Sequence, residues 1–248
     1  MRTTGNTILV SGGTSGIGRA LAERWHADGN TVVVAGRRKD LLDEIAAAHP
    51  GIETLELDVA DPASIPAAAT TVADRFPALD VLVTMAGIMR PEDLRDPAHL
   101  ADAEATVTTN LLGTIRTVSA FLPQLLGREQ ATVMTVSSGL AFVPLPVTPT
   151  YNATKAGVHS YTESLRVQLA GTPVQVVELV PPAVQTGLLG TPDPSWMPLA
   201  EFVDEVAGIL AAEPDVREVL VGQVRPLRFA EAEGHYDQVL AAMAASAG

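Results

Sequence analysis

Short runs of apolar and β-branched residues alternate with longer amphipathic stretches along almost the whole chain. The short runs predict strands, and the stretches between them, whose apolar residues recur at helical spacing, predict helices. The predicted strands are 7–10, 31–35, 53–57, 81–84, 132–136, 174–180 and 219–221. The predicted helices are 16–28, 39–48, 62–75, 97–126, 151–170 and 200–212. This alternation indicates an α/β fold, a doubly wound parallel sheet of about seven strands with helices on both faces.

Several predicted helix boundaries carry residues that suit their positions. Asp61 is a favourable capping residue and Pro62 fits a first helical position, so we expect a helix to begin at 62. Gly29 follows the first predicted helix, where a left-handed residue is favourable. The segment 181–199 contains five prolines and is too long and too apolar to be a passive connection.

Composition and charge narrow the class of protein. The chain has 248 residues, 47% hydrophobic and only 4% aromatic, so we expect one domain, 1–248, with a mainly aliphatic core. Cysteine is absent, which excludes disulfides and zinc–thiolate sites, and we expect no metal. The net charge of −13 argues against nucleic acid or an anionic membrane as a partner. The sequence shows neither a signal-peptide pattern nor a membrane-spanning apolar run, so we expect a cytoplasmic protein.

A glycine-rich segment joins the first predicted strand to the first predicted helix. Residues 11–18 read Ser-Gly-Gly-Thr-Ser-Gly-Ile-Gly. Because glycine has no Cβ, the backbone there can turn tightly and approach a pyrophosphate, which binds over the N-terminus of the following helix. The sequence therefore predicts a nucleotide-binding loop. Its expected contact residues are Gly12, Thr14, Ser15, Gly16, Ile17 and Gly18.

Tyr151 and Lys155 lie four residues apart in a predicted helix, so their side chains share one face, about 5–6 Å apart at the β carbons. A nearby ammonium favours the phenolate and lowers the pKa of a phenol, which is ordinarily about 10. Tyr151 is thus a candidate proton donor and acceptor near neutral pH. Taken alone, the pair also fits a solvated helix face. The chain has only two lysines, Lys39 and Lys155, which makes chance placement less favourable.

The glycine motif, the Tyr-x-x-x-Lys pair and the spacing between them resemble the short-chain dehydrogenase/reductase family along nearly the whole chain. The run Glu-Leu-Val-Pro-Pro-Ala-Val-Gln-Thr at 178–186 and the opening glycine loop are similar to the DltE-type branch of that family. The resemblance implies a Rossmann-like fold, a cofactor half at about 1–136 and a catalytic and substrate half at about 137–248. It also implies hydride transfer between a nicotinamide cofactor and a carbonyl or alcohol.

The resemblance implies four catalytic residues, Asn110, Ser138, Tyr151 and Lys155. Ser138 would hydrogen-bond the substrate oxygen and Tyr151 would exchange its proton, while Lys155 would bind the nicotinamide ribose. The neighbouring Ser137 is the alternative for the serine, because either residue ends the predicted strand 132–136. Asn110 interrupts a helix-forming stretch, where asparagine is unfavourable, and would hold a helix kink and a water that links Lys155 to solvent.

The end of the second predicted strand indicates which cofactor binds. It reads Val-Ala-Gly-Arg-Arg at 34–38, with Gly36 where NAD-binding relatives carry an acid. Arginine at this edge accommodates the 2′-phosphate of NADP, so we expect Arg37 and Arg38 to favour NADP(H) over NAD(H). By resemblance, further cofactor contacts come from the ends of the later strands. These residues are Asp58, Val59, Ala86, Gly87, Pro181, Val184 and Thr186, together with Tyr151 and Lys155.

Two positions depart from the family pattern. Thr84-Met85-Ala86-Gly87 stands where relatives commonly have Asn-Asn-Ala-Gly, so the usual amide hydrogen bonds are missing there. Pro182 replaces a usual glycine. We still expect a mainly apolar small-molecule substrate, bound by Met89, Arg90, Leu140, Phe142, Leu188 and Trp196.

Segment 187–199 carries Leu188, Leu189, Trp196 and Met197, and its glycines at 187 and 190 can absorb a hinge motion, so we expect a lid over the substrate. A fixed loop packed on the core is the alternative. Epimerisation or dehydration through transient oxidation, and a non-catalytic dinucleotide sensor, are the alternative functions.

Helices 97–126 and 151–170 carry more apolar positions than one sheet face covers. We therefore expect a homodimer or homotetramer.

Overall fold

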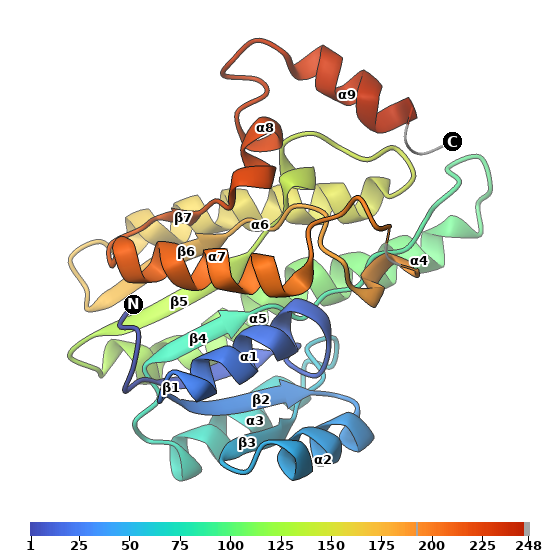
Figure 1. Ribbon diagram of the computed structural model, residues 1–248. Helices are drawn as coiled ribbons and strands as arrows, with labels where there is room; N and C mark the ends of the chain where they lie inside the picture. The colour runs from blue at the N-terminus through green and yellow to red at the C-terminus, as the bar shows by residue number, and fades with distance from the viewer. Residues whose placement is uncertain (192, 246–248) are drawn as a thin grey trace.

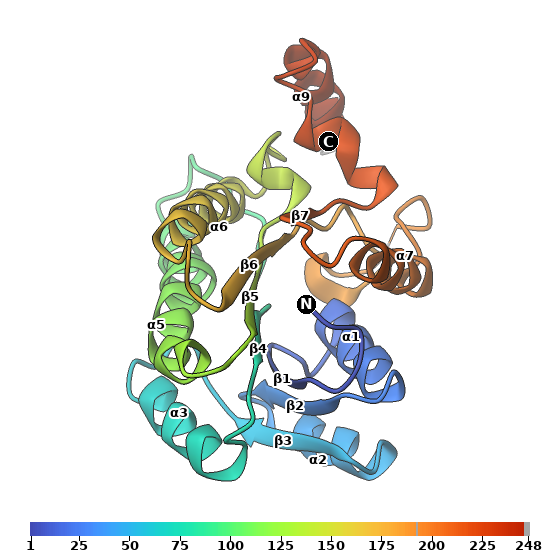
Figure 2. The same ribbon diagram turned by 90° about the vertical axis from the view of Figure 1, so that its left-hand side faces the viewer.

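In residues 1–191 and 193–245, which the computed structural model describes, seven parallel strands form a central sheet in the order β3-β2-β1-β4-β5-β6-β7 (Figures 1 and 2). The predicted doubly wound Rossmann-like sheet is confirmed. The strands are β1 (Thr7–Ser11), β2 (Thr31–Gly36), β3 (Ile52–Glu56), β4 (Val81–Thr84), β5 (Ala131–Val136), β6 (Val174–Leu179) and β7 (Glu218–Val219). Both expected halves of the chain contribute strands to this one sheet; the last three residues, 246–248, lie outside the described residues.

Helices cover both faces of the sheet, as Figure 2 shows with the sheet seen edge-on. Helices α1, α2 and α7 lie on one face, and α3, α5 and α6 lie on the other. The helices are α1 (Gly16–Ala27), α2 (Lys39–Ala48), α3 (Ser64–Arg75), α4 (His99–Thr106), α5 (Gly113–Leu126), α6 (Pro149–Gln168), α7 (Leu199–Ala212), α8 (Arg225–Arg228) and α9 (Tyr236–Ala245). None of the described helices has both the length and the apolar character needed to span a bilayer.

The strands are buried because successive side chains enter two different apolar layers. In β1, Ile8 and Val10 join the layer under α1 and α7, whereas Leu9 joins the layer under α5 and α6. All three side chains are fully buried. This alternation explains why the strands read as continuous apolar runs in the sequence.

Several predicted elements and boundaries were wrong, and three differences affect the fold most. Helix α3 begins at Ser64, not at 62, because the Asp61 carboxylate accepts a hydrogen bond from the Ala63 N–H at 2.8 Å and forms a turn before the helix. The single helix predicted for 97–126 is interrupted by a π-helical segment, Val107–Leu112, between α4 and α5. Strand β7 covers 218–219 instead of 219–221, and α8 and α9 were not predicted.

The strand order places the candidate site. The chain passes from β3 back across β1 to β4, so the sheet reverses its winding between β1 and β4. In open α/β sheets a ligand binds in the crevice outside the carboxyl ends of the strands at this point. The glycine-rich loop after β1 and the catalytic candidates after β5 both lie at that edge.

Candidate active site

A cleft of about 1040 Å³ lies at the carboxyl edge of the sheet. Every residue that the sequence predicted to contact the cofactor lines it. These residues are Gly12, Thr14, Ser15, Gly16, Ile17, Gly18, Arg37, Arg38, Asp58, Val59, Ala86, Gly87, Tyr151, Lys155, Pro181, Val184 and Thr186. Residues from both halves of the chain therefore share one cavity.

The glycine-rich loop packs too closely for side chains. A Cβ on Gly12, whose φ is 75°, would lie 2.6 Å from the backbone N and Cα of Ala86, and a Cβ on Gly18 would lie 2.5 Å from the Gly12 carbonyl oxygen. The loop turns at this point into the first turn of α1, where backbone N–H groups favour an anion. Thr186 approaches from the far side of the cleft, 3.6 Å from the Cβ position of Gly16. The loop thus fits the diphosphate of a dinucleotide.

The edge of the cleft beside β2 is basic and leaves little room for an acid. Arg38 donates hydrogen bonds to the hydroxyls of Thr14, at 3.1 Å, and Ser15, at 2.9 Å. A Cβ on Gly36 would lie 2.7 Å from Thr14 Cγ2. An aspartate at 36 would therefore displace Thr14, whose rotamer is fixed by its bond to Arg38.

Tyr151 and Lys155 project from α6 toward the end of β5, and both side chains are buried. The Lys155 Nζ donates a hydrogen bond to the Val136 carbonyl oxygen at 2.8 Å and lies 5.6 Å from the centre of the Tyr151 ring. The Tyr151 phenol hydrogen-bonds the hydroxyl of Ser138. The structure therefore brings three of the four predicted catalytic side chains together at the cleft.

The expectation that Lys155 lowers the pKa of Tyr151 was wrong. Burial raises the pKa of Tyr151 to about 12, and the hydrogen bond with Ser138 offsets only part of this rise. Burial also lowers the pKa of Lys155 to about 8, against the opposing charge of Glu178. Desolvation is the largest cause of both shifts. At neutral pH the phenol is protonated, as a proton donor requires.

The two serines after β5 have different neighbours. Ser138 faces Tyr151 and its Oγ accepts a hydrogen bond from the Leu140 N–H at 3.1 Å. Ser137 instead donates its hydroxyl hydrogen to the buried carboxylate of Glu178. This arrangement supports Ser138, rather than Ser137, as the serine that meets a substrate.

Asn110 lies in the π-helical segment and is fully buried behind the cleft wall. Its Oδ1 accepts from the Ile88 N–H at 2.8 Å, and its Nδ2 donates to the Ile88 carbonyl at 2.9 Å. A Cβ on Gly87 would lie 3.3 Å from Asn110 Oδ1 and 3.9 Å from Lys155 Nζ. The expected helix distortion is present, and it ties the loop after β4 to the catalytic helix.

The substrate end of the cleft is mainly apolar, and most of its predicted residues line it: Met89, Arg90, Leu140, Leu188 and Trp196. Phe142 does not, because its ring packs edge-on against His159, with 4.8 Å between centroids, beneath the Arg228 guanidinium. Met197 was also expected in the lid surface, but it is buried in the core, where Val184 pairs with it.

Sequence reasoning missed several residues of this end. Leu145 and Val147 line the cleft from the loop before α6, and Leu227 and Met243 line it from α8 and α9. The last two follow predicted helix 200–212 by many residues, in a stretch without a clear periodic pattern, so no signal pointed to them.

Glu92 was also missed. Its side chain is almost completely buried, and its carboxylate accepts hydrogen bonds from the backbone N–H of Thr150, at 3.0 Å, and from its hydroxyl, at 2.7 Å. A carboxylate at a helix N-terminus accepts from a backbone N–H that has no partner within the helix, and its negative charge is stabilised by the positive end of the helix dipole. Glu92 therefore holds the first turn of α6 through Thr150, the residue that precedes Tyr151. Its 58-residue separation from Thr150 hid this role in the sequence.

The departure at the end of β4 has a visible consequence. The Thr84 hydroxyl is buried and has no hydrogen-bond partner among the described residues. The expectation that the family's sheet-stabilising amide bonds are lost here agrees with this orphaned group.

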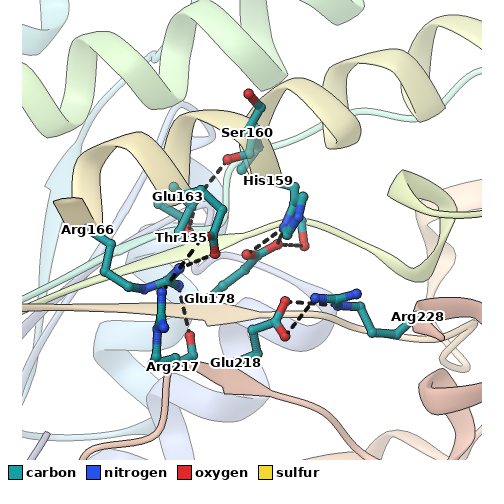
Figure 3. A network of polar contacts seen from close by, with 12 residues as sticks. Thr135, His159, Ser160, Glu163, Arg166, Glu178, Arg217, Glu218 and Arg228 are labelled. Atoms are coloured by element: carbon teal, nitrogen blue, oxygen red, sulfur yellow. Dashed lines mark hydrogen bonds and ion pairs between the residues drawn. The ribbon is translucent and has the colours of Figure 1, made fainter. Parts of the chain in front are cut away.

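The sequence predicted no metal. Among the described residues one group has ligand-like spacing: the side-chain ligand atoms of His159, Glu178 and Glu218 lie within 4.8 Å of one another (Figure 3). These carboxylates already have partners, since Glu178 accepts from Ser137 and Glu218 pairs with Arg228 at 2.9 and 3.1 Å.

Known proteins are similar to this chain in sequence and in fold. Residues 6–194 match the short chain dehydrogenase family. A Bacillus subtilis (strain 168) protein named "Uncharacterized oxidoreductase DltE" is 39% identical over 190 residues, which cover 76% of this chain and 75% of that protein. The chain therefore belongs to the short-chain dehydrogenase family and is an oxidoreductase of that family.

Solved structures extend the likeness over the full fold. A short chain dehydrogenase from Burkholderia cenocepacia J2315 in complex with NADP is 26% identical, with a TM-score of 0.83 over 98% of both chains. One from Burkholderia phymatum in complex with NAD is 24% identical, with a TM-score of 0.79 over 96% of this chain and 95% of that one. Both structures share the fold of this chain.

Proposed function

We propose that the protein is an NADP(H)-dependent oxidoreductase that transfers a hydride between the nicotinamide and the carbonyl carbon, or secondary alcohol, of a mainly apolar small molecule. The convergence of Ser138, Tyr151 and Lys155 in the cleft that contains the glycine-rich loop carries this proposal. The apolar lining of the substrate end supports the substrate class.

When bound, the cofactor supplies or accepts the hydride. The hydroxyls of Ser138 and Tyr151 hold the substrate oxygen, and Tyr151 donates its proton to that oxygen during reduction. A pKa of about 12 keeps this proton on Tyr151 until negative charge develops on the substrate. Lys155 binds the nicotinamide ribose and supports the resulting phenolate. Asn110 holds the distorted helix beside Lys155. The path by which a proton returns from solvent to Tyr151 through Lys155 passes this distortion.

A panel of ketones and secondary alcohols, followed by nicotinamide absorbance, tests the proposal. Tyr151→Phe should reduce turnover by roughly 10²–10⁴-fold, because only the hydroxyl acts on the transition state. Its NADPH affinity, from titration calorimetry, should stay within a few-fold because the ring still packs. Tyr161→Phe, on the same helix but outside the cleft lining, is the matched control and should keep full turnover.

Other outcomes of the panel favour other functions. Product formation without net cofactor consumption would indicate epimerisation or dehydration through transient oxidation. Tight cofactor binding without turnover on any member would indicate a dinucleotide sensor. Retained turnover in Tyr151→Phe would contradict the proposed proton donor.

The basic edge beside β2 supports NADP(H) over NAD(H). Arg37 and Arg38 line the cleft, and the crowding between Gly36 and Thr14 disfavours a ribose-binding acid at 36. Arg38→Ala should weaken NADPH binding by roughly 1.5–3 kcal/mol, the range for a charge-assisted hydrogen bond, with Arg37→Ala acting in the same direction. NADH affinity should barely change.

Titration calorimetry with both cofactors measures this selectivity. Arg19→Ala is the control, since Arg19 pairs with Glu23 and Glu44 outside the cleft lining and its loss should leave both affinities unchanged. Equal losses for NADPH and NADH in Arg38→Ala would refute binding of the 2′-phosphate.

A further inference from the structure

A strip of polar side chains lies between α6 and the sheet, where the rest of the layer is apolar. Thr135 on β5 hydrogen-bonds Thr162 on α6 at 2.7 Å, and beside them the Glu178 carboxylate on β6 meets the His159 ring (Figure 3). Ser137 completes the strip next to the cleft. Neither Glu178 nor His159 has a part in the proposed reaction.

Glu178 is completely buried in the middle of this strip. Its carboxylate accepts from the Ser137 hydroxyl, and the His159 Nδ1 lies 3.0 and 2.9 Å from its two oxygens. Burying a charge is costly, and an apolar residue of similar volume is often the more stable choice. Stability alone therefore does not account for a charged residue at this position.

Glu178 contacts the segment that carries the candidate catalytic serine. Its partner Ser137 precedes Ser138 directly. Four residues beyond Ser138, Phe142 packs against His159, the other partner of Glu178. The carboxylate and its imidazole thus contact both ends of the short segment 137–142.

Glu178 also acts on Lys155 through its charge. Lys155 is buried, its Nζ donates to the Val136 carbonyl, and Glu178 is the acidic residue whose charge favours its ammonium form. Val136 and Ser137 are neighbours in sequence, so the ammonium and the carboxylate contact adjacent residues at the same strand end. His159, the other partner of Glu178, is four residues from Lys155 on α6, one helical turn away.

We propose that Glu178 is a positioning residue of the active site: its negative charge stabilises the Lys155 ammonium, and its bond to Ser137 fixes the segment that carries Ser138. His159 is the solvent-facing partner that modulates this charge. The inference rests on the proposed catalytic role of Lys155.

The surroundings of His159 suit that role. Its side chain is 25% exposed and lines an open pocket of about 880 Å³, none of whose lining residues lines the cofactor cleft. The charged groups that face it are Glu178 on β6, Glu218 on β7, Arg228 on α8 and Glu163 on its own helix. The hydrogen bond with Glu178 raises the pKa of His159 above its ordinary value. As the pH rises through that pKa, His159 loses its charge and Glu178 supports Lys155 more strongly.

Nuclear magnetic resonance of isotope-labelled lysine tests the charge directly, without substrate or cofactor. The chain has two lysines, so Lys39, which is exposed, serves as an internal reference for Lys155. In Glu178→Gln the pKa of Lys155 should fall below its value of about 8, and the alkaline limb of the kcat profile should move to lower pH with it. The same Lys155 midpoint in a folded Glu178→Gln variant would overturn the proposal.

Two matched variants separate the parts of the proposal. Glu218→Gln removes a charge that acts on His159 and not directly on Lys155, so the Lys155 midpoint should move much less than in Glu178→Gln. Ser137→Ala keeps the Glu178 charge but removes its bond to the serine segment, and it should lower kcat more than it raises KM without moving that midpoint. An unchanged kcat in Ser137→Ala would refute the positioning part.

The wild type gives an independent reading if Glu178→Gln does not fold. In a pH titration, the chemical shift of Lys155 should change at the pH where Lys155 itself loses its proton. It should change a second time, by a smaller amount, at the pH where His159 loses its proton. A single step would overturn the coupling. A shifted midpoint in a protein that turns over no substrate would refute the proposed function and leave the charge coupling standing.

Discussion

Lys155 combines complete burial with a place in the candidate active site. Its pKa is about 8 in the folded protein and 10.5 in the unfolded chain, so folding disfavours the charged form. Below pH 8 the ammonium therefore costs stability, and the cost declines as the pH rises from 8 to 10.5. Functional groups often carry such a penalty.

Lys155→Met should consequently raise the stability of the protein at neutral pH while it abolishes turnover. We expect a gain of roughly 1–3 kcal/mol, seen as a higher Tm in calorimetry, because methionine fills the same space without a charge. The gain should shrink as the pH approaches 10.5. Lys39→Met, at the exposed start of α2, should leave Tm nearly unchanged, and a lower Tm in Lys155→Met would contradict the argument.

Single residues were predictable where a local signal accompanied them. Asn110 was an unfavourable residue in a helix-forming stretch, and the helix is distorted there. Glu92 and Glu178 had no such signal, because their partners Thr150 and Ser137 are 58 and 41 positions away. Only the folded chain brings these carboxylates to their hydroxyl and amide partners.

At the level of elements, the segment after β6 is held more firmly than the sequence suggested. The Gln185 N–H donates to the Met197 carbonyl at 2.9 Å, and its side chain donates to the carbonyls of Pro194, at 3.1 Å, and Trp196, at 2.9 Å. Gln185 thus closes the base of the proposed lid, and Gly190, with a φ of 87°, lies within it. Pro192 of the predicted lid 187–199 lies outside the described residues.

We expect closure of this segment over bound ligand, with the motion confined to the part beyond the Gln185 base. Hydrogen exchange in 187–191 should slow when NADPH and substrate bind, because Leu188, which is 46% exposed, then becomes covered. Exchange at Met197 should stay slow in both states. Equal protection of 187–191 with and without ligands would indicate a fixed wall.

Gln185→Ala provides the matched perturbation. Loss of its side-chain bonds to Pro194 and Trp196 should speed exchange at the base and raise KM for substrate more than for NADPH. Gln130→Ala, an exposed residue before β5, is the control.

For the whole molecule, the sheet was predictable because its central strands, such as β2, β4 and β5, are largely apolar runs. A helix distortion at Asn110 was expected, but its π-helical form was not, since that form depends on the hydrogen bonds between Asn110 and Ile88. The C-terminal helices α8 and α9 were missed because no residue of either is buried. Without a buried face, their sequences lack the periodicity that marks the other helices.

The outer surface of α4, α5 and α6 carries exposed apolar side chains, which supports the expected oligomer. Leu100 on α4 is 57% exposed and Val167 on α6 is 73% exposed, with Leu112 in the π-helical segment also accessible. Exposed apolar residues on neighbouring helices are compatible with a symmetric interface. Light scattering at micromolar concentration should show a dimer or tetramer.

Charge on this surface should dissociate the oligomer. The double variant Leu112→Glu with Val167→Glu should shift the mass toward the monomer without loss of secondary structure. Leu94→Glu, 63% exposed but in the loop after β4, should keep the wild-type mass. A wild type that is monomeric at micromolar concentration would contradict the interface.

The close approach between Gly36 and Thr14 has a consequence for how this protein can change during evolution or engineering. Acquiring a ribose-binding aspartate at 36 requires space that Thr14 occupies, so the order of substitutions is constrained: position 14 must shrink first. A smaller residue at 14 alone adds no ribose-binding acid, and it removes one of the two hydroxyls that Arg38 contacts, the other being that of Ser15. We therefore expect the proposed preference for NADP(H) to depend on both positions together: NADH affinity should improve in Thr14→Gly with Gly36→Asp but not in Gly36→Asp alone.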